Sequence, residues 1–324
     1  MTAASPQNDA HSARSGRWRT FLRWAGLALS VVALGWICAR FARSGSLELL
    51  ARLEPTPVLV LAFAVGTSVY FLALVMLAFA WWRMLARFSQ RDLPASSAMA
   101  LYAVSQYGKY LPGNVAHYAL RHGWGRRRGL RHESLALAAL LEAVLLALVA
   151  LALAFFSDPR SARVLASINL PLAIVCIAGA VTVLVWAIRW ARSSPRMKRW
   201  EVPHLGAATL LEATVCYAVF FLCGAISLVV LAHALGIGVD GFRTLLAANA
   251  ASWVAGFIVV GAPAGLGVRE VAFVALAGTA LGDADALLLA GLFRITTFAG
   301  DTLFFAVGSL VARREARRSG ERVA

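Results

Sequence analysis

Charged residues are scarce in this chain of 324 residues. They make up 15% of the sequence, and only 16 of them are acidic, whereas soluble domains carry about 25% charged residues. Hydrophobic residues reach 60%, and apolar runs of 18 or more residues recur, which soluble cores do not contain. The sequence therefore excludes an ordinary soluble domain and predicts an integral membrane protein.

Several other patterns are missing. The polar–apolar alternation of a membrane barrel is absent, so all-α spans are predicted, because a helix pairs its backbone groups within its own segment. Nucleotide-binding loops, nucleophile triads and metal-ligand spacings are also absent, and no metal or cofactor is predicted. The four cysteines lie in apolar segments without disulfide or metal spacing: Cys38, Cys176, Cys216 and Cys223.

Six apolar segments are predicted to cross the membrane: 25–42, 57–82, 134–157, 166–188, 206–235 and 286–311. Two further apolar stretches, 95–122 and 244–281, are each interrupted by a turn containing Pro and Gly. Their second arms, 114–122 and 268–281, would reach roughly 14 and 21 Å, less than the ~30 Å thickness of the hydrocarbon. We therefore predict two re-entrant helical hairpins.

The order of these segments predicts an internal repeat. Two spans, a hairpin and a span form a half at about 21–160, and the same order follows at 161–312. Three crossings in each half invert the second half relative to the first, which is a common architecture of transporters. The two halves form a single integral domain, 21–315, between a disordered cytoplasmic tail, 1–20, and a basic cytoplasmic tail, 313–324.

The net charge of +15 is distributed unevenly. Most of the 31 Lys and Arg residues lie before the first span, in 83–131, in 189–199 and after the last span. The positive-inside rule places these regions, and both termini, in the cytoplasm of a bacterial-type inner (plasma) membrane. The charge orients the chain and attracts anionic lipid, so membrane lipids are the predicted partners and nucleic acid is not.

The two interrupted stretches contain related motifs. The first reads GKYLPGN and is followed by Arg121, and the second reads GAPAGLGVRE. Together they resemble the paired signatures of the lysylphosphatidylglycerol synthase transmembrane region, a flippase-like membrane protein family, over about residues 20–315. Asn114 and Ala264 stand where the family pattern suggests glycine. The resemblance implies a membrane protein that moves or handles anionic or modified lipids, and fused relatives carry a soluble lipid-modifying domain.

A helix N-terminus within the membrane, combined with a basic side chain, favours anions. Lys109 and Arg121 flank the first turn and Arg269 follows the second, so we predict that both hairpins bind a lipid headgroup. The alternative is that Arg269 pairs with Glu270 or Asp301 and only stabilises the hairpin. The predicted headgroup residues are Lys109, Pro112, Gly113, Asn114, Arg121, Pro263, Gly265, Gly267, Arg269 and Glu270.

Four ionisable residues inside spans are candidates for a proton or charge relay, because such groups are costly in a membrane and are commonly functional. Glu142 and Glu212 are isolated carboxyl groups in apolar segments, with hydrogen bonding to a neighbouring helix as the alternative. Arg294 and Asp301 are seven residues apart on one helix face, so each is expected to find its partner on another element. For His117, packing is the favoured role.

Three functions remain open. A lipid binder and translocase is favoured by the repeat and by the basic groups inside the membrane. A membrane-embedded glycosyl or acyl transferase acting on a lipid carrier would use an acidic motif such as Asp283-Ala-Asp285, although helix capping explains that motif better. The third is a non-transporting partner of a separate lipid-modifying enzyme. Aminoacylated phospholipid, polyprenyl-linked sugar and hopanoid-type lipid are all possible substrates.

Overall fold

A computed structural model describes residues 56–89, 93–111, 116–158, 206–238, 241–259 and 263–319. These residues form eight α-helices and two short 3₁₀ helices, with no strand among them. The prediction of an all-α protein is confirmed. The helices are α3 (Pro57–Ser89), α4 (Ala95–Gln106), η1 (Tyr107–Tyr110), α5 (Ala116–Arg127), α6 (His132–Ser157), α8 (Ala207–Ala234), α9 (Phe242–Ile258), η2 (Pro263–Gly265), α10 (Val268–Leu281) and α11 (Asp283–Ser319).

Five helical segments among the described residues are long and apolar enough to cross a membrane. Four of them, α3, α6, α8 and α11, coincide with predicted spans. The fifth is Pro263–Leu281, which joins η2 to α10. Within it, α10 begins and ends where the short second arm of the hairpin was predicted. The other two predicted spans, 25–42 and 166–188, lie outside the described residues, as do the predicted tail at 1–20 and Pro112, Gly113 and Asn114.

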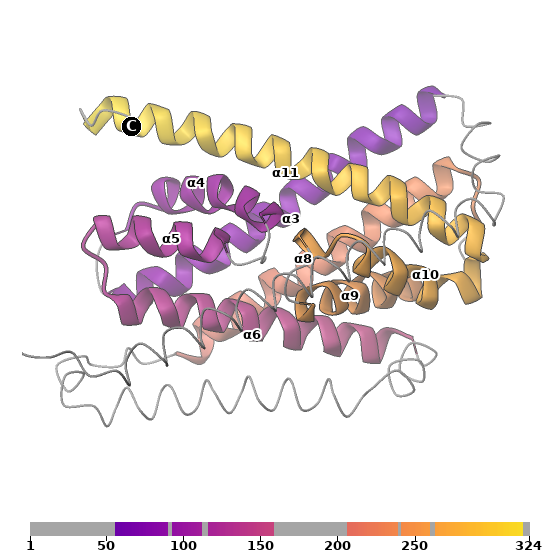
Figure 1. Ribbon diagram of the computed structural model, residues 1–324, viewed down its shortest axis with the longest axis horizontal. Helices are drawn as coiled ribbons and strands as arrows, with labels where there is room; N and C mark the ends of the chain where they lie inside the picture. The colour runs from indigo at the N-terminus through magenta and orange to yellow at the C-terminus, as the bar shows by residue number, and fades with distance from the viewer. Residues whose placement is uncertain are drawn as a thin grey trace, which may run out of the picture.

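The centre of the fold is the pair α3 and α8, which pack against each other along much of their length. Figure 1 shows α11 along one side of this pair and α6 along the other. Both helices carry almost completely buried apolar side chains, Leu74 and Trp81 on α3 and Phe221 and Leu228 on α8, and the rings of Tyr70 and Phe220 meet across the pair. Deep in the pair, Ser227 Oγ on α8 donates a hydrogen bond to the backbone oxygen of Gly66 on α3 at 3.0 Å. Small residues and buried hydroxyls of this kind are typical of helix packing in membranes.

Contacts between elements occur in matched sets. The helix α4 packs on α3 and α11, and α9 packs on α8 and α6. Likewise α5 contacts α6, and α10 contacts α11. The two 3₁₀ turns, η1 and η2, contact each other, so the interrupted points of two stretches more than 150 residues apart in the sequence meet inside the fold.

The helix α5 runs further than the predicted arm, which was expected to end at residue 122. It continues to Arg127 and stops at Gly129, whose φ is 74°. The N–H of Leu130 donates to Gly125 O at 2.9 Å, and the N–H of Gly129 donates to Arg126 O at 3.0 Å. This is the Schellman arrangement that ends helices at a left-handed glycine. Arg126 and Arg127 are compatible with a helix, so α5 continues past the predicted end of the arm until Gly129 terminates it.

The second hairpin turns through three residues with positive φ angles. The φ angles are 51° at Ala264, 70° at Gly265 and 81° at Gly267. Glycine adopts such angles without penalty, whereas an alanine pays roughly 1–2 kcal/mol. Ala264 is thus the strained member of the turn, at the position where the family pattern suggested a glycine.

Candidate functional site

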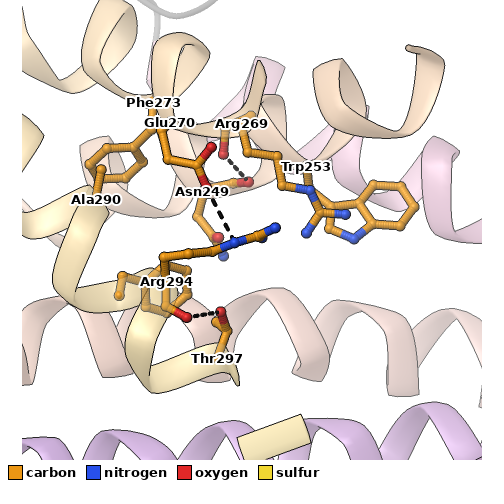
Figure 2. Close-up of a pocket in the computed structure, with 10 residues that line it drawn as sticks. Asn249, Trp253, Arg269, Glu270, Phe273, Ala290, Arg294 and Thr297 are labelled. Carbon is orange, nitrogen blue, oxygen red and sulfur yellow. Dashed lines mark hydrogen bonds and ion pairs between the residues drawn. The ribbon is translucent and has the colours of Figure 1, made fainter. Parts of the chain in front are cut away.

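A small cavity of about 40 Å³ lies between α9, α10 and α11. Its polar lining comes from Asn249 and Ser252 on α9, Arg269 and Glu270 on α10, and Arg294 and Thr297 on α11. Figure 2 shows the side chains of the two arginines reaching into the same space. The cavity therefore gathers hydrogen-bond donors from three elements of the second half.

Two glycines allow Arg269 to reach the cavity. A Cβ atom added at Gly256 would lie 2.5 Å from Arg269 Cγ, and one added at Gly265 would lie 2.8 Å from Nε. Contacts this short do not occur, so the arginine side chain runs over bare backbone of the first arm, at Gly256, and of the turn, at Gly265. Gly265 was a predicted site residue, whereas Gly256 was not, because nothing in a helical segment of small residues distinguishes it.

Glu270 caps its own helix. Its Oε2 accepts a hydrogen bond from the N–H of Gly267 at 2.6 Å, which is the carboxylate half of a capping box and the only half that a glycine at the N-cap allows. Its Oε1 lies 3.4 Å from Arg294 Nε, and Arg294 Nη2 donates to Ala264 O at 3.0 Å. Glu270 and Arg294 therefore connect α10, α11 and the η2 turn.

Arg269 has no such partner. Its Nε is buried without a hydrogen-bond acceptor, and no salt bridge to it is present in the described part of the chain. Its guanidinium carbon lies 5.7 Å from the centroid of the Trp253 ring, where a cation–π attraction offsets part of the cost of burial. The two carboxylates that the alternative interpretation offered to Arg269, Glu270 and Asp301, pair with other cations.

Asp301 is the partner of Lys109. Lys109 Nζ donates to Asp301 Oδ1 at 2.7 Å, and Tyr110 Oη donates to Oδ2 at 2.6 Å. Asp301 is 1% exposed. The expectation that Arg294 and Asp301 each find a partner on another element is confirmed. Because η1 contacts η2, this ion pair lies close to the turn of the second hairpin. The first hairpin thus places the Lys109–Asp301 pair beside the elements that line the cavity.

Arg121 lies in a different environment. Its Nη1 donates to Glu142 Oε2 at 2.7 Å, and the other carboxylate oxygen accepts from Tyr102 Oη at 2.7 Å. The guanidinium carbon stacks 4.0 Å from the Tyr102 ring centroid, with Tyr118 and Trp81 at 5.2 and 5.5 Å. The adjoining cavity, about 270 Å³, shares no lining residue with the cavity at Arg269. The structure therefore separates the two arginines, and Arg121 is the one that has an ion-pair partner.

Neither candidate carboxylate is isolated: each accepts hydrogen bonds from neighbouring helices, as the alternative interpretation expected, and in both cases one donor is an arginine. Glu142 is buried and holds Arg121, as described above. Glu212 accepts two hydrogen bonds from Arg83, from Nε at 2.9 Å and from Nη2 at 3.0 Å. The Arg83 and Glu212 side chains are 31% and 40% exposed. Arg83 and Glu212 lie 129 residues apart and meet only because α3 packs on α8, which the sequence did not reveal.

The polar groups of the cavity were also missed. Asn249, Ser252 and Thr297 occur in helical segments rich in small residues, where they look like ordinary packing residues. His117 fits its predicted packing role, since it is buried and its ring centroid lies 4.0 Å from that of Tyr118. In the described ranges no three His, Cys, Asp or Glu side chains gather closely enough to hold a metal ion.

Comparison with known proteins agrees with the two hairpin motifs. A search of the curated proteins found no match to the chain. The family model described as "Lysylphosphatidylglycerol synthase TM region" matches residues 13–304. This match covers both hairpins, all of α3 to α10 and the part of α11 that carries Arg294 and Asp301. The protein is therefore a multi-pass membrane protein that belongs to the family of the lysylphosphatidylglycerol synthase transmembrane region.

Proposed function

We propose that this protein binds the phosphate of an anionic lipid at Arg269 and moves the lipid between the leaflets of the inner membrane. The observation that carries the proposal is a buried arginine that faces a polar cavity and lacks a carboxylate partner among the described residues. An uncompensated buried charge is expensive. A bound phosphate would remove that cost, and arginine matches its geometry well.

The hydroxyls and the amide around the cavity support the same ligand. Asn249 keeps one amide N–H for a phosphate oxygen while Arg269 supplies the charge. The hydroxyls of Ser252 and Thr297 donate to backbone oxygens of their own helices at 2.9 Å, and they would rotate toward a bound phosphate. Arg294 lies within the same space, held by Glu270. Of the ten residues predicted to bind a headgroup, Arg269 is therefore proposed as the direct ligand, while Pro263, Gly265, Gly267 and Glu270 shape the turn. Of the four residues predicted for a charge relay, we retain Arg294 and Asp301 in this proposal, because they lie at or near the cavity.

We further propose six crossings and two re-entrant hairpins in an inverted repeat, with both termini in the cytoplasm. The matched contacts of α3–α6 and α8–α11 support this repeat, as does the contact between η1 and η2. In such an architecture the two hairpin tips approach each other inside the membrane, and rocking of one half against the other exposes the site to each side in turn. The Lys109–Asp301 pair joins the halves at that point.

In the described part of the chain, no observation favours the alternative of a membrane-embedded glycosyl or acyl transferase. Asp283 and Asp285 lie in the first turn of α11, where a helix N-terminus stabilises carboxylates. Helix capping therefore explains their spacing without a catalytic role.

The test uses the purified full-length protein in liposomes with a fluorescent phosphatidylglycerol. Leaflet-specific quenching over time gives the rate of transfer, with no nucleotide or sugar donor present. Arg269→Ala should lower the rate at least about tenfold, the loss expected for one charge-assisted hydrogen bond. Arg127→Ala, which removes an exposed arginine at the end of α5, should leave the rate unchanged. Equal rates for the wild type and Arg269→Ala would overturn the proposal, and modification of the lipid that depends on a donor would support an enzyme.

A further inference from the structure

The Lys109–Asp301 ion pair joins the tip of the first hairpin to the last helix of the fold. Lys109 Nζ donates to one carboxylate oxygen of Asp301 at 2.7 Å, and Tyr110 Oη donates to the other at 2.6 Å. Lys109 and Tyr110 belong to η1, whereas Asp301 lies at the middle of the 37 residues of α11. The two elements are therefore connected by a charged contact far from both ends of a long apolar helix.

The two partners differ in their access to the surroundings. The side chain of Asp301 is 1% exposed, whereas that of Lys109 is 19% exposed. In the described part of the chain, Lys109 pairs with no other carboxylate and Asp301 pairs with no other cation. Lys109 can therefore turn toward a new anion, but Asp301 stays enclosed when its partner leaves.

We infer, on the basis of the proposed function, that this pair couples the transfer of the lipid to the transfer of a proton. A lipid phosphate that moves from Arg269 toward the first hairpin reaches Lys109, because η1 contacts the η2 turn beside the cavity. Lys109 then exchanges Asp301 for the phosphate. A buried carboxylate that has lost its cation takes up a proton, because an unpaired charge inside the membrane costs more than a neutral carboxyl group.

The charges balance through this exchange. Before it, Lys109 and Asp301 neutralise each other, and the lipid phosphodiester carries its negative charge. After it, Lys109 neutralises the phosphate, and Asp301 is neutral because it holds a proton taken from the water. When the lipid leaves on the other side, the ion pair forms again and the proton is released there. One proton therefore travels with each lipid anion in the same direction, and no net charge crosses the membrane.

Asp301 is the carboxylate that the exchange leaves without a cation. Among the elements that contact η1 or α11, α10 carries Glu270 and α8 carries Glu212, and each of these keeps an arginine partner. The other titratable or charged side chains on elements beside the pair are Tyr110 on η1, Tyr70 on α3, His117 on α5, Arg269 on α10 and Arg294 on α11. None of these is a carboxylate, so Asp301 is assigned as the proton acceptor.

The experiment measures how fluorescent phosphatidylglycerol is distributed at steady state between the leaflets of liposomes that contain the full-length protein. Valinomycin with equal potassium on both sides holds the membrane potential at zero while a pH difference of about one unit is imposed. The label should shift toward the leaflet on the alkaline side by up to about tenfold, since one pH unit is equivalent to a tenfold concentration ratio of protons. A membrane potential imposed at equal pH should not shift it. Protein-free liposomes under the same gradients give the background.

Three variants test the assignment to Asp301. Asp301→Asn removes the proton acceptor and should abolish the shift caused by the pH difference. Lys109→Gln combined with Asp301→Asn leaves no unpaired charge behind and should abolish the shift as well, even if the single variant does not fold. Glu212→Gln is the matched control, because it makes a similar change from carboxylate to amide in a partly exposed pair, and it should keep the shift.

The outcomes separate the coupling from the proposed function. Equal transfer rates for the wild type and Arg269→Ala would overturn the proposed function itself. If transfer depends on Arg269 but the wild-type distribution follows the membrane potential and ignores the pH difference, the function stands and the coupling is wrong. A shift that persists in Asp301→Asn would overturn the assignment to Asp301. The wild-type measurement decides the coupling even if neither Asp301 variant folds.

Discussion

Glu270 is bonded to Arg294, 24 positions further along the chain, and not to its neighbour Arg269. The capping box turns the Glu270 side chain back toward the amide of Gly267, and from there its second oxygen faces Arg294 at 3.4 Å. Arg269 leaves the same helix turn in another direction, across the bare backbone of Gly256 and Gly265. The geometry of one helix start thus determines which of two arginines keeps an unneutralised charge.

The first prediction concerns Arg121, which should behave unlike Arg269. Arg121→Ala leaves Glu142 buried without its ion-pair partner, which costs roughly 3–5 kcal/mol. The variant should lose thermal stability in detergent, measured by size-exclusion chromatography after heating, whereas Arg269→Ala should keep it. Replacing both partners, as Arg121→Met with Glu142→Leu, should recover most of the stability, because an apolar pair commonly replaces a buried ion pair without loss. A fully stable Arg121→Ala protein would contradict the structural role.

The second prediction tests the path of Arg269. Gly256→Ala places a methyl group 2.5 Å from Arg269 Cγ, so the arginine must move away from the cavity. Transfer of phosphatidylglycerol should fall about tenfold, at an overpacking cost of about 1–3 kcal/mol. Gly291→Ala in α11 is the matched control, since a Cβ atom there meets nothing within 4 Å. If both variants transport equally well, the position of Arg269 does not matter.

The third prediction revises the role of Glu212. Its partner Arg83 and its partial exposure make it half of a surface-type ion pair, and such pairs contribute little to stability. Glu212→Gln should therefore keep both the transfer rate and its dependence on pH. A slower rate with a flattened pH profile in the liposome assay would restore the proton relay that the sequence alone suggested.

The fourth prediction fixes the topology. The turn after α5 should face the cytoplasm and the turn after α8 should face outward. In a variant whose native cysteines are replaced by serine, an impermeant maleimide added to intact cells should label Gly238→Cys but not Arg127→Cys. Labelling of Arg127→Cys would reverse the proposed orientation. Permeabilised cells, in which both positions should react, provide the control.

The helices could be predicted from the sequence, whereas the ion pairs between them could not. Long apolar runs identified α3, α6, α8 and α11, since length and hydropathy are local properties. The turn motif located α10 because glycines and a proline stand together there. Two ion pairs join elements that are far apart in the chain: Lys109 with Asp301, and Arg83 with Glu212. The spacing of residues along the sequence therefore does not reveal them. The same reason explains why two carboxyl groups that looked isolated turned out to be paired.

Ala264, which has a left-handed backbone conformation, makes the turn of the second hairpin strained. Its backbone conformation stores roughly 1–2 kcal/mol, and its carbonyl is held by the guanidinium of Arg294. The same turn contacts η1 of the other hairpin. One residue in an unfavourable backbone conformation therefore stands between the wall of the Arg269 cavity and the point where the two hairpins meet.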